Sequence, residues 1–449
     1  MMASTAGCQT GPTAMQRAHQ AYYQGDFLGA RVELAGVVKK DRRQRDVASL
    51  DLAIVELAAG EVTAADSLLR HCRNTFDERH PLRSVPSMRT LLTDDRDQPY
   101  DAVGYEDVMI RSLLSIASLM SDSGDAEAYA IQAHLRQAEL AEDAEQRGLE
   151  NLGDVYQPLP LAPYIRGLVR EATHHDYDDA ARAYQWVAQW KPDFPPLQMD
   201  IRRVTEGTHS PPGWGVVYLF ALVGRGPLRE EQAAEATSAA LLVADRIVAA
   251  SSNLVIPPTL APIPVPAVRI PYSPVEALGA TVNGQPLGVT STITDVAQMA
   301  LRQVEGEMPW IIARGIVRRT AKKSIVSTSM HSIDTGNGLA NLGGALLGSA
   351  WEAAERADTR CWSLLPREIQ VLRIELPAGK HRLTVVPLGP HGNWSVRPDS
   401  VSAVHRQGGV VSSAVEAEVL VRDGMNSYLL AVAPENAVTA LCVGHSGTN

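Results

Sequence analysis

The chain has 449 residues, of which 45% are hydrophobic and only 5% aromatic, and its 41 Lys and Arg against 51 Asp and Glu leave a formal net charge of −10. This length favours two or three domains with ample material for a core, and the negative charge argues against a nucleic-acid-coating protein. No apolar run of about 18 residues or more occurs, so no transmembrane helix is predicted. The four cysteines form no CxxC or CxxH pattern, which argues against a zinc ribbon and a disulfide framework.

The first part of the chain, from Ala14 to about Lys191, has a helical pattern in which helix-turn-helix units follow one another. The turn residues Gly25 and Gly60 lie about one tetratricopeptide period, about 34 residues, apart. A third turn at Gly124 and a further unit follow at irregular spacing. We therefore expect a degenerate tetratricopeptide-like helical domain over 14–200, with three tyrosines of the repeat positions in its core: Tyr22, Tyr164 and Tyr184.

After Pro195 the pattern changes to strands. The stretch "GWGVVYLFALVGRGPLREE" is typical of a buried strand that ends in a Gly-Pro turn. The stretch "SSNLVIPPTLAPIPVPAVRIPYSP" is too rich in proline for a helix and predicts edge strands or a wrapping connection. Asn283-Gly284 stands between two alternating runs and indicates a tight hairpin, because a type I′ turn needs positive φ at both central residues. Later strands are expected in "EIQVLRIEL", "KHRLTVVPL", "GVVSSAVEAEVLVRD" and "SYLLAVA".

Helices are expected inside this second part as well. Asp295 caps one helix, with Gln298 three residues on, and Pro309 is expected to begin a second helix at its first position. The stretch "GLANLGGALLGSA" predicts close packing of a helix, with self-association through the small-xxx-small pair Gly344 and Gly348 as the alternative. The sequence thus predicts an α+β protein whose β-rich domain, over 201–449, holds one or two packed helices.

The stretch "STAGCQTGP" near the start resembles the cleavage site of a bacterial lipoprotein signal. A signal peptidase needs small side chains just before the cut, and the thiol of Cys8 would accept a diacylglyceryl group. We therefore expect residues 1–13 to be the remnant of such a signal and a tether, with lipidation at Cys8 and a start codon placed too late. The alternative is an unstructured tail that carries a chance cysteine.

A family resemblance rests on four stretches: "YQGDFLGAR", "YIRGLVREATHHDYDDAARAY", "MPWIIARGIVRRTAKK" and "ADTRCWSLLPREIQVLRIELPAGKHRLTV". From Cys8 to about Val386 the chain resembles a family of uncharacterised bacterial envelope lipoproteins with a tetratricopeptide-like N-terminal half. The resemblance implies a mature protein that starts at a lipidated cysteine, and genes that often lie near those of lipoproteins that activate penicillin-binding proteins. It implies no activity, and this chain departs from the family because the charged and apolar parts of the signal are missing.

Two motifs suggest chemistry but have simpler interpretations. Asp334-Thr335-Gly336 is the triplet that holds a catalytic carboxylate in aspartic proteases. The second triplet that such an enzyme needs would be Asp122-Ser123-Gly124, which lies at a turn between predicted helices, so a loop turn is the favoured interpretation of the first. The stretch "HHDYDD" could supply metal ligands, but adjacent residues point in different directions, and acids that complement a helix dipole are the simpler account. No metal and no cofactor is predicted.

The stretch "WIIARGIVRRTAKKS" predicts an amphipathic basic helix. Basic residues recur along one face, while Trp310, Ala313 and Ile316 lie on the other. Such a face would suit an anionic lipid, a glycan phosphate or an acidic partner, and the alternative is a solvated or interdomain-paired face. The residues expected to make an anionic-surface contact are Arg314, Arg318, Arg319, Lys322 and Lys323.

These features predict a non-enzymatic envelope lipoprotein that acts as a protein-protein interaction scaffold, with peptidoglycan or outer-membrane assembly as its setting. The partner is expected on the concave surface of the helical repeats, because stacked helix pairs expose such a groove, and a lipid anchor would hold the protein at a membrane facing the periplasm. Two alternatives stay open. One is an envelope hydrolase with cleft carboxylates such as Asp334 or Asp358, and the other is a soluble cytoplasmic repeat adaptor.

Overall fold

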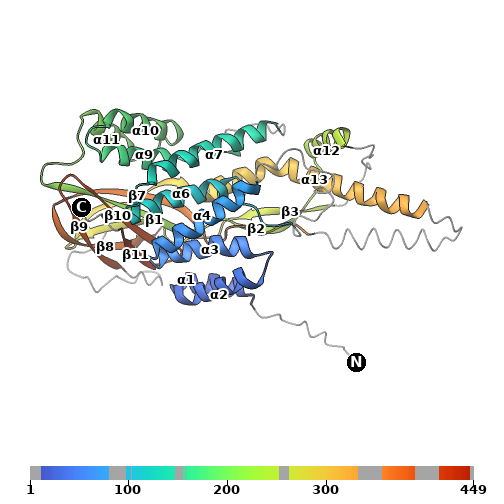
Figure 1. Ribbon diagram of the computed structural model, residues 1–449, viewed down its shortest axis with the longest axis horizontal. Helices are drawn as coiled ribbons and strands as arrows, with labels where there is room; N and C mark the ends of the chain where they lie inside the picture. Colours follow the sequence, from blue (N-terminus) through green and yellow to red (C-terminus); the bar gives the residue numbers. More distant parts are fainter. Residues whose placement is uncertain are drawn as a thin grey trace, which may run out of the picture.

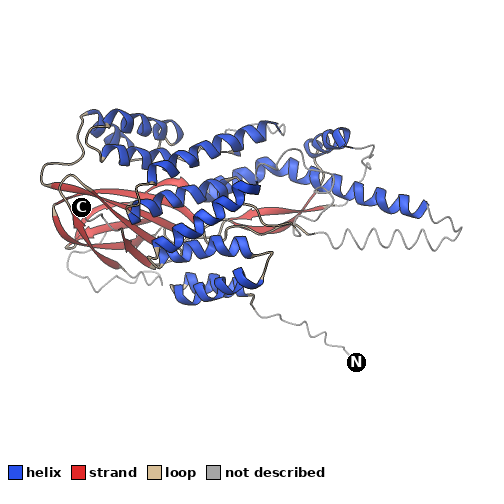
Figure 2. Ribbon diagram, in the orientation of Figure 1, coloured by secondary structure: helices blue, strands red, loops and turns tan. Residues whose placement is uncertain are grey.

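The computed structural model describes residues 12–79, 98–102, 104–146, 155–156, 158–251, 262–331, 356–389 and 414–444. Helices come first along the chain and mixed sheets follow, so the predicted α+β class is confirmed. Figure 1 shows the N-terminal helices layered against the strands, and Figure 2 shows the same view by secondary structure. Within the described ranges, every helix is too short or too polar to cross a bilayer.

The helical part is built from hairpins joined by short turns. Three turn glycines, Gly25, Gly60 and Gly124, all have φ of 79°, a conformation that residues with a Cβ atom rarely adopt, so the three predicted turns are confirmed. The helices are α1 (Ala14–Tyr23), α2 (Phe27–Lys40), α3 (Arg45–Ala58), α4 (Val62–Arg79), α6 (Tyr105–Ser121), α7 (Ala126–Gln146), α9 (Leu161–Glu171), α10 (Tyr177–Trp190) and α11 (Leu197–Thr205).

Tyrosines fill the core between the paired helices. Tyr22, Tyr164 and Tyr184 are buried, as predicted. The ring of Tyr164 lies 5.7 Å from that of Tyr184 and 5.6 Å from that of Phe194, measured between centroids. A Cβ atom added at Gly167 would lie 2.5 Å from Tyr184 Cε1. Glycine at this position therefore lets α9 and α10 close around a large ring.

The described strands form three sheets. The five-stranded sheet has the order β11 (Ala440–Val443), β10 (Asn426–Ala433), β1 (Trp214–Arg225), β7 (Pro366–Pro377) and β6 (Ser291–Asp295). The four-stranded sheet has the order β5 (Gln285–Val289), β4 (Ala277–Val282), β8 (Gly379–Leu388) and β9 (Val415–Val421). β2 (Leu228–Ala234) pairs with β3 (Ile263–Arg269), and the prolines of β3 thus lie in a two-stranded ribbon, as their density predicted.

Strand β1 lies at the centre of the molecule and is covered on both faces. It pairs in parallel with β10 and antiparallel with β7. Val216, Tyr218 and Phe220 belong to the core shared with the helices, whereas Val217 and Leu219 belong to the core shared with the four-stranded sheet. Because side chains alternate along a strand, the unbroken apolar run of β1 serves two interfaces. The protein therefore has three layers: helices, the five-stranded sheet and the four-stranded sheet.

Local signals in the second part placed several elements correctly. Asn283 and Gly284 have φ of 50° and 75° and join β4 to β5, so the predicted hairpin is confirmed. Asp295 Oδ1 accepts a hydrogen bond of 2.8 Å from the Gln298 backbone N–H, as the capping pattern indicated. Strands β7 to β10 occupy the predicted C-terminal stretches, whereas the short β11 was not predicted.

The prediction that a second helix begins at Pro309 is wrong, because Pro309 lies inside the single long helix α13 (Val296–His331). Val296, Met299 and Ala300, before Pro309, belong to the core shared with α6 and β7. After Pro309, the α13 residues Ile312 and Ile316 pack in a second core with residues of β3 and of α12 (Ser238–Ser251). A proline inside a helix removes one backbone hydrogen bond, and packing on both sides of it offsets that loss. Helix α13 runs away from the sheets toward the right of Figure 1.

The expected domain boundary at residue 200 falls inside α11. One continuous hydrophobic core contains residues of the N-terminal helices together with residues of β1, β7 and β10. A smaller core lies between α12, α13 and β3. The division into a helical and a β-rich domain stays a prediction, but the two parts share one packed interior.

Candidate functional site

The inner face of the helical array is covered by the protein's own sheet. All residues of α6 from Tyr105 to Met120 are buried, and the shared core joins α3, α6 and α9 to Tyr218 and Phe220 of β1. The face of the helical array that packs on the sheet is therefore not open to a partner, and binding of a partner by the helical repeats stays a prediction. This face is covered because β1 presents a second apolar face, and burial of that face on the helices removes it from water.

Three buried acids fasten the inner helices to the second half of the chain. Asp51 Oδ1 of α3 accepts a hydrogen bond of 2.9 Å from the Leu364 backbone N–H, and Glu106 Oε1 of α6 accepts one of 3.0 Å from the Trp362 backbone N–H. Glu171 Oε1 of α9 lies 3.5 Å from Arg373 Nη2. All three carboxylates are fully buried. Because a buried polar group without its partner is costly, these contacts hold the helical layer in one position on the sheet.

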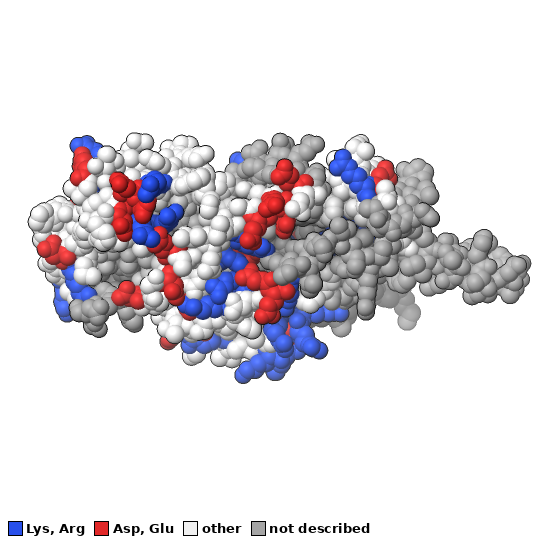
Figure 3. Space-filling view, turned by 45° about the horizontal axis from the view of Figure 1, so that its top comes forward, with Lys and Arg blue, Asp and Glu red and all other residues white. Residues whose placement is uncertain are grey.

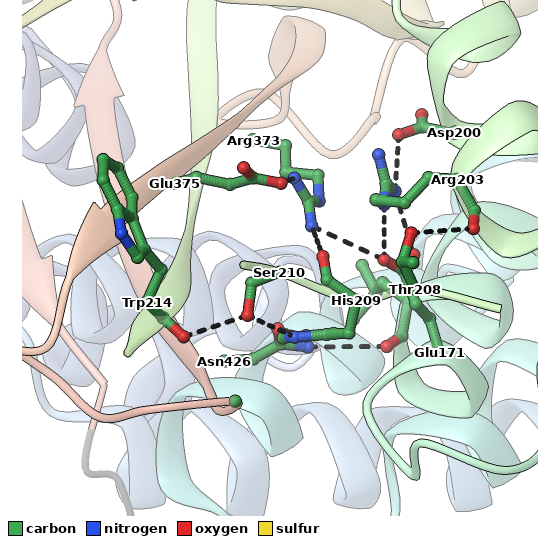
Figure 4. Close-up of polar contacts among 12 residues, drawn as sticks. Glu171, Asp200, Arg203, Thr208, His209, Ser210, Trp214, Arg373, Glu375 and Asn426 are labelled. Carbon is green, nitrogen blue, oxygen red and sulfur yellow. Dashed lines mark hydrogen bonds and ion pairs between the residues drawn. The ribbon is translucent and has the colours of Figure 1, made fainter. Parts of the chain in front are cut away.

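The contact around Glu171 is a network of ion pairs, which we call the helix-sheet junction (Figure 4). Glu171 accepts hydrogen bonds from Arg203 Nε at 2.5 Å, from Arg203 Nη2 at 2.9 Å and from the Tyr184 hydroxyl at 2.9 Å. Arg203 Nη2 also donates to Asp200 Oδ1 at 2.8 Å. Burial raises the pKa of Asp200 to about 6, although the guanidinium of Arg203 opposes that rise.

A histidine completes the helix-sheet junction on the side of β10. His209 Nε2 lies 2.8 Å from Asn426 Oδ1, and its backbone carbonyl accepts a hydrogen bond from Arg373. Burial lowers the pKa of His209, and the charge of Arg373 lowers it further. His209 Nδ1 lies 3.1 Å from Ser210 Oγ, but that hydroxyl donates to the Trp214 carbonyl at 2.9 Å. Ser210 is thus engaged in closing a turn, and we interpret the junction as a structural network.

Several predicted site residues lie outside the described residues. They are Cys8, the triplet Asp334-Thr335-Gly336 and the glycines Gly344 and Gly348. Lys322 and Lys323 belong to α13, but their side chains are not among those described. The lipidation and the protease-like triplet therefore stay predictions.

The arginines of the predicted basic helix face protein for the most part. Arg318 and Arg319 of α13 are only 5% and 6% exposed, and Arg319 Nη2 donates to the Pro262 carbonyl at 2.9 Å. Arg314 is half-buried. Among the described side chains, Arg318 and Arg319 are therefore buried against protein, as in the alternative interpretation of a paired face. Little of either side chain is accessible to an anionic surface.

The histidines and acids of "HHDYDD" diverge. His174 Nε2 lies 2.6 Å from the Gly424 carbonyl, and His175 Nδ1 lies 2.6 Å from the Thr173 carbonyl. Asp176 pairs with Arg170, while Asp178 and Asp179 stand in the first turn of α10, where acids stabilise the helix dipole. Throughout the described part of the chain, no three His, Cys, Asp or Glu side chains are arranged to hold a metal ion.

The second acid of the hydrolase alternative is engaged in a local contact. Asp358 Oδ2 pairs with Arg360 Nη2 at 2.7 Å, and Arg360 in turn donates to the backbone carbonyls of Arg43 and Gln98 at 3.0 Å. This arrangement ties the segment before β7 to the helical layer. It is typical of a structural ion pair, because the carboxylate is already neutralised by its neighbour.

Large apolar side chains gather on the outer side of the array, on helices α7 and α10. Ile131, Leu135 and Trp186 are 39%, 55% and 45% exposed. His134 stacks on the half-buried Trp190 with 5.3 Å between ring centroids, and Trp186 lies 5.3 Å from Trp190. Burial and the nearby Arg166 lower the pKa of His134, which keeps its ring neutral at pH 7. We call these five residues the α7/α10 surface.

Acids lie along the α7 side of the α7/α10 surface, whereas Arg166, the basic residue near His134, pairs with Glu127 at 3.3 Å. Glu142 and Glu145 follow Ile131 at helical spacing on the same face of α7, and both are exposed. Glu139, which pairs with Arg136 at 2.7 Å, lies beside them. On the face of the molecule shown in Figure 3, acidic and basic side chains lie next to one another in bands among uncharged surface, and a group of basic side chains lies along the lower edge.

Sequence reasoning missed both features. The apolar residues of the α7/α10 surface follow i, i+3 and i+4 spacing, so their helical period could have pointed to them. The sequence could not show that this face is exposed, because a buried apolar face of a helix has the same spacing. The helix-sheet junction has no local signal, since its partners come from α9, α11, β7 and β10.

Comparison with known proteins adds no relative: no protein-family model, no curated protein and no solved structure matches the chain.

Proposed function

We propose that the protein is a non-enzymatic envelope lipoprotein that holds a partner protein on its helical layer, in the setting of peptidoglycan or outer-membrane assembly. The lipid anchor is assigned to Cys8. The observation that carries the scaffold proposal is the fastening of the helical layer by Asp51, Glu106 and Glu171. A layer held in one position by buried polar contacts is preorganised, and preorganisation lowers the entropy lost on binding.

The character of the described polar clusters also supports a scaffold. The carboxylates of the helix-sheet junction pair with arginines, and Asp358 pairs with Arg360. Catalytic acids, in contrast, need a substrate within hydrogen-bonding reach. These pairings favour a binding role over the hydrolase alternative.

Lipidation is tested by metabolic labelling of the protein, expressed from its own gene, with an alkyne-bearing fatty acid. We expect the label on the wild-type protein and its loss in Cys8→Ser, together with release of the variant from the membrane fraction. A matched control is Cys442→Ser, because Cys442 contacts the carbonyls of Leu57 and Ala58 inside the fold. Equal labelling of wild type and Cys8→Ser would rule out the anchor.

The scaffold role is tested by affinity purification of the tagged protein from crosslinked envelope membranes. We expect one envelope protein to be retained in stoichiometric amount by the wild-type protein. The control is the same purification with a variant in which the helical layer is loosened, Glu171→Ala. Failure to retain any protein, or equal retention by an unrelated tagged lipoprotein, would contradict the proposal.

A further inference from the structure

We propose that the α7/α10 surface is the docking site, and that its occupant is a segment of a partner protein with an apolar face flanked by lysines or arginines. This inference deepens the proposed function and rests on it. It replaces the concave groove as the place where the partner binds, because the inner helices α3, α6 and α9 are covered by the sheet.

The location follows from what the array leaves exposed. Single exposed apolar side chains are ordinary on protein surfaces, whereas clustered ones mark interaction sites. Ile131 and Leu135 are exposed on α7 within one helical turn of His134, and the His134 ring lies 5.9 Å from that of the exposed Trp186 and 5.3 Å from that of Trp190. The two helices that carry them both pack on α9, so the surface spans two adjacent hairpins.

The chemistry of the occupant follows first from the anchors. Tryptophan is among the residues that contribute most to protein interfaces, and the neighbouring Ile131 and Leu135 favour apolar side chains over the polar rim of a sugar ring. His134 is neutral at pH 7 because burial lowers its pKa, so it adds aromatic area without a positive charge. These side chains favour a protein segment over a saccharide.

The charge of the occupant follows from the border of the surface. Glu142 lies two helical turns beyond Leu135 on the same face, about 10 Å along the axis. Within the described residues neither Glu142 nor Glu145 makes an ion pair. Acids at a border attract basic side chains and repel anionic lipid and glycan phosphate. A second copy of the chain is disfavoured as well, because a two-fold contact would bring the same acids together.

The experiment begins with identification of the occupant in cells. A photo-crosslinking amino acid replaces the exposed Gln189 of α10, and a control carries it at the exposed Gln232 of β2. We expect an adduct at position 189 that is absent at 232. Mass spectrometry of the adduct should give a peptide with apolar residues at helical or strand spacing and a net positive charge.

That peptide is then synthesised and titrated against the full-length protein. Leu135→Ala combined with Trp186→Ala should weaken binding at least tenfold. Glu142→Gln combined with Glu145→Gln should weaken it about threefold and reduce its salt dependence. Leu28→Ala combined with Val32→Ala, an even more exposed apolar pair on α2, should leave binding unchanged. Unchanged thermal unfolding shows that each variant is folded.

Four outcomes would overturn the inference: no adduct at position 189, an adduct with lipid or glycan, an adduct with a second copy, or a peptide whose affinity is unaffected by the Leu135 and Trp186 changes. The scaffold proposal fails separately. If the purified partner is retained equally by the wild-type protein and by the Leu135→Ala, Trp186→Ala variant, the scaffold role stands and the α7/α10 surface is excluded as its site.

Discussion

Replacement of Glu171 by glutamine should destabilise the protein by about 3 kcal/mol. The carboxylate neutralises Arg203 through two contacts and lies 3.5 Å from Arg373, all within the interior. Loss of one partner from a buried pair costs about 3–5 kcal/mol, because a charge stays buried without compensation. Asp200 remains 2.8 Å from Arg203, and a glutamine oxygen can still accept from the Tyr184 hydroxyl. Both contacts place the expected loss at the lower end of that range.

The measurement is urea-induced unfolding at pH 7.5, followed by tryptophan fluorescence. The matched control is Glu206→Gln, which removes the exposed pair of Glu206 with Arg202 at the C-terminal end of α11, the helix that carries Arg203. Such a pair contributes at most about 0.5 kcal/mol. Hydrogen exchange in α9 and α11 should rise in Glu171→Gln alone. A loss of less than about 1 kcal/mol, or equal losses in both variants, would refute the reasoning.

Three further predictions concern single sites. Burial raises the pKa of Asp200 to about 6, so the folded protein holds this proton more tightly than the unfolded chain, and stability from this group grows as pH falls from about 6 to about 4. Asp200→Asn should therefore raise the unfolding free energy at pH 7.5 by at most about 3 kcal/mol and not at pH 4, as urea titrations at both pH values would reveal. Gly167→Ala should cost about 1–3 kcal/mol in the same assay, because its Cβ atom would displace the Tyr184 ring; an unchanged midpoint would contradict the packing. Burial raises the pKa of Cys361 to about 11 and that of Cys72 to about 12, so iodoacetamide at pH 8 should alkylate both only after unfolding, and rapid labelling of the native protein, seen by peptide mass spectrometry, would argue against their burial.

The sequence predicted the turns and strands correctly where a few neighbouring residues set the backbone conformation. Gly25 and Gly60 form turns at positive φ, a backbone conformation that glycine adopts without steric cost. Asn283 and Gly284 also have positive φ and form the predicted hairpin turn. The unbroken apolar run of β1 indicated burial, and the structure added that two different layers cover it. Pro309 misled because its effect depends on what packs around the helix, which is information that the chain does not carry locally.

By itself, then, the sequence determined the helical hairpins, their turns, the later strands and the α+β class, because each depends on the conformational preference of a few neighbouring residues. Only the tertiary structure decided which helical face is available. Asp51 meets the backbone of Leu364 across 313 residues, and Glu106 meets that of Trp362 across 256. Helical periodicity reports that a face is apolar and is silent about what covers it. The sheet covers the inner face of the helices, whereas the outer face stays exposed to solvent at Leu135 and Trp186.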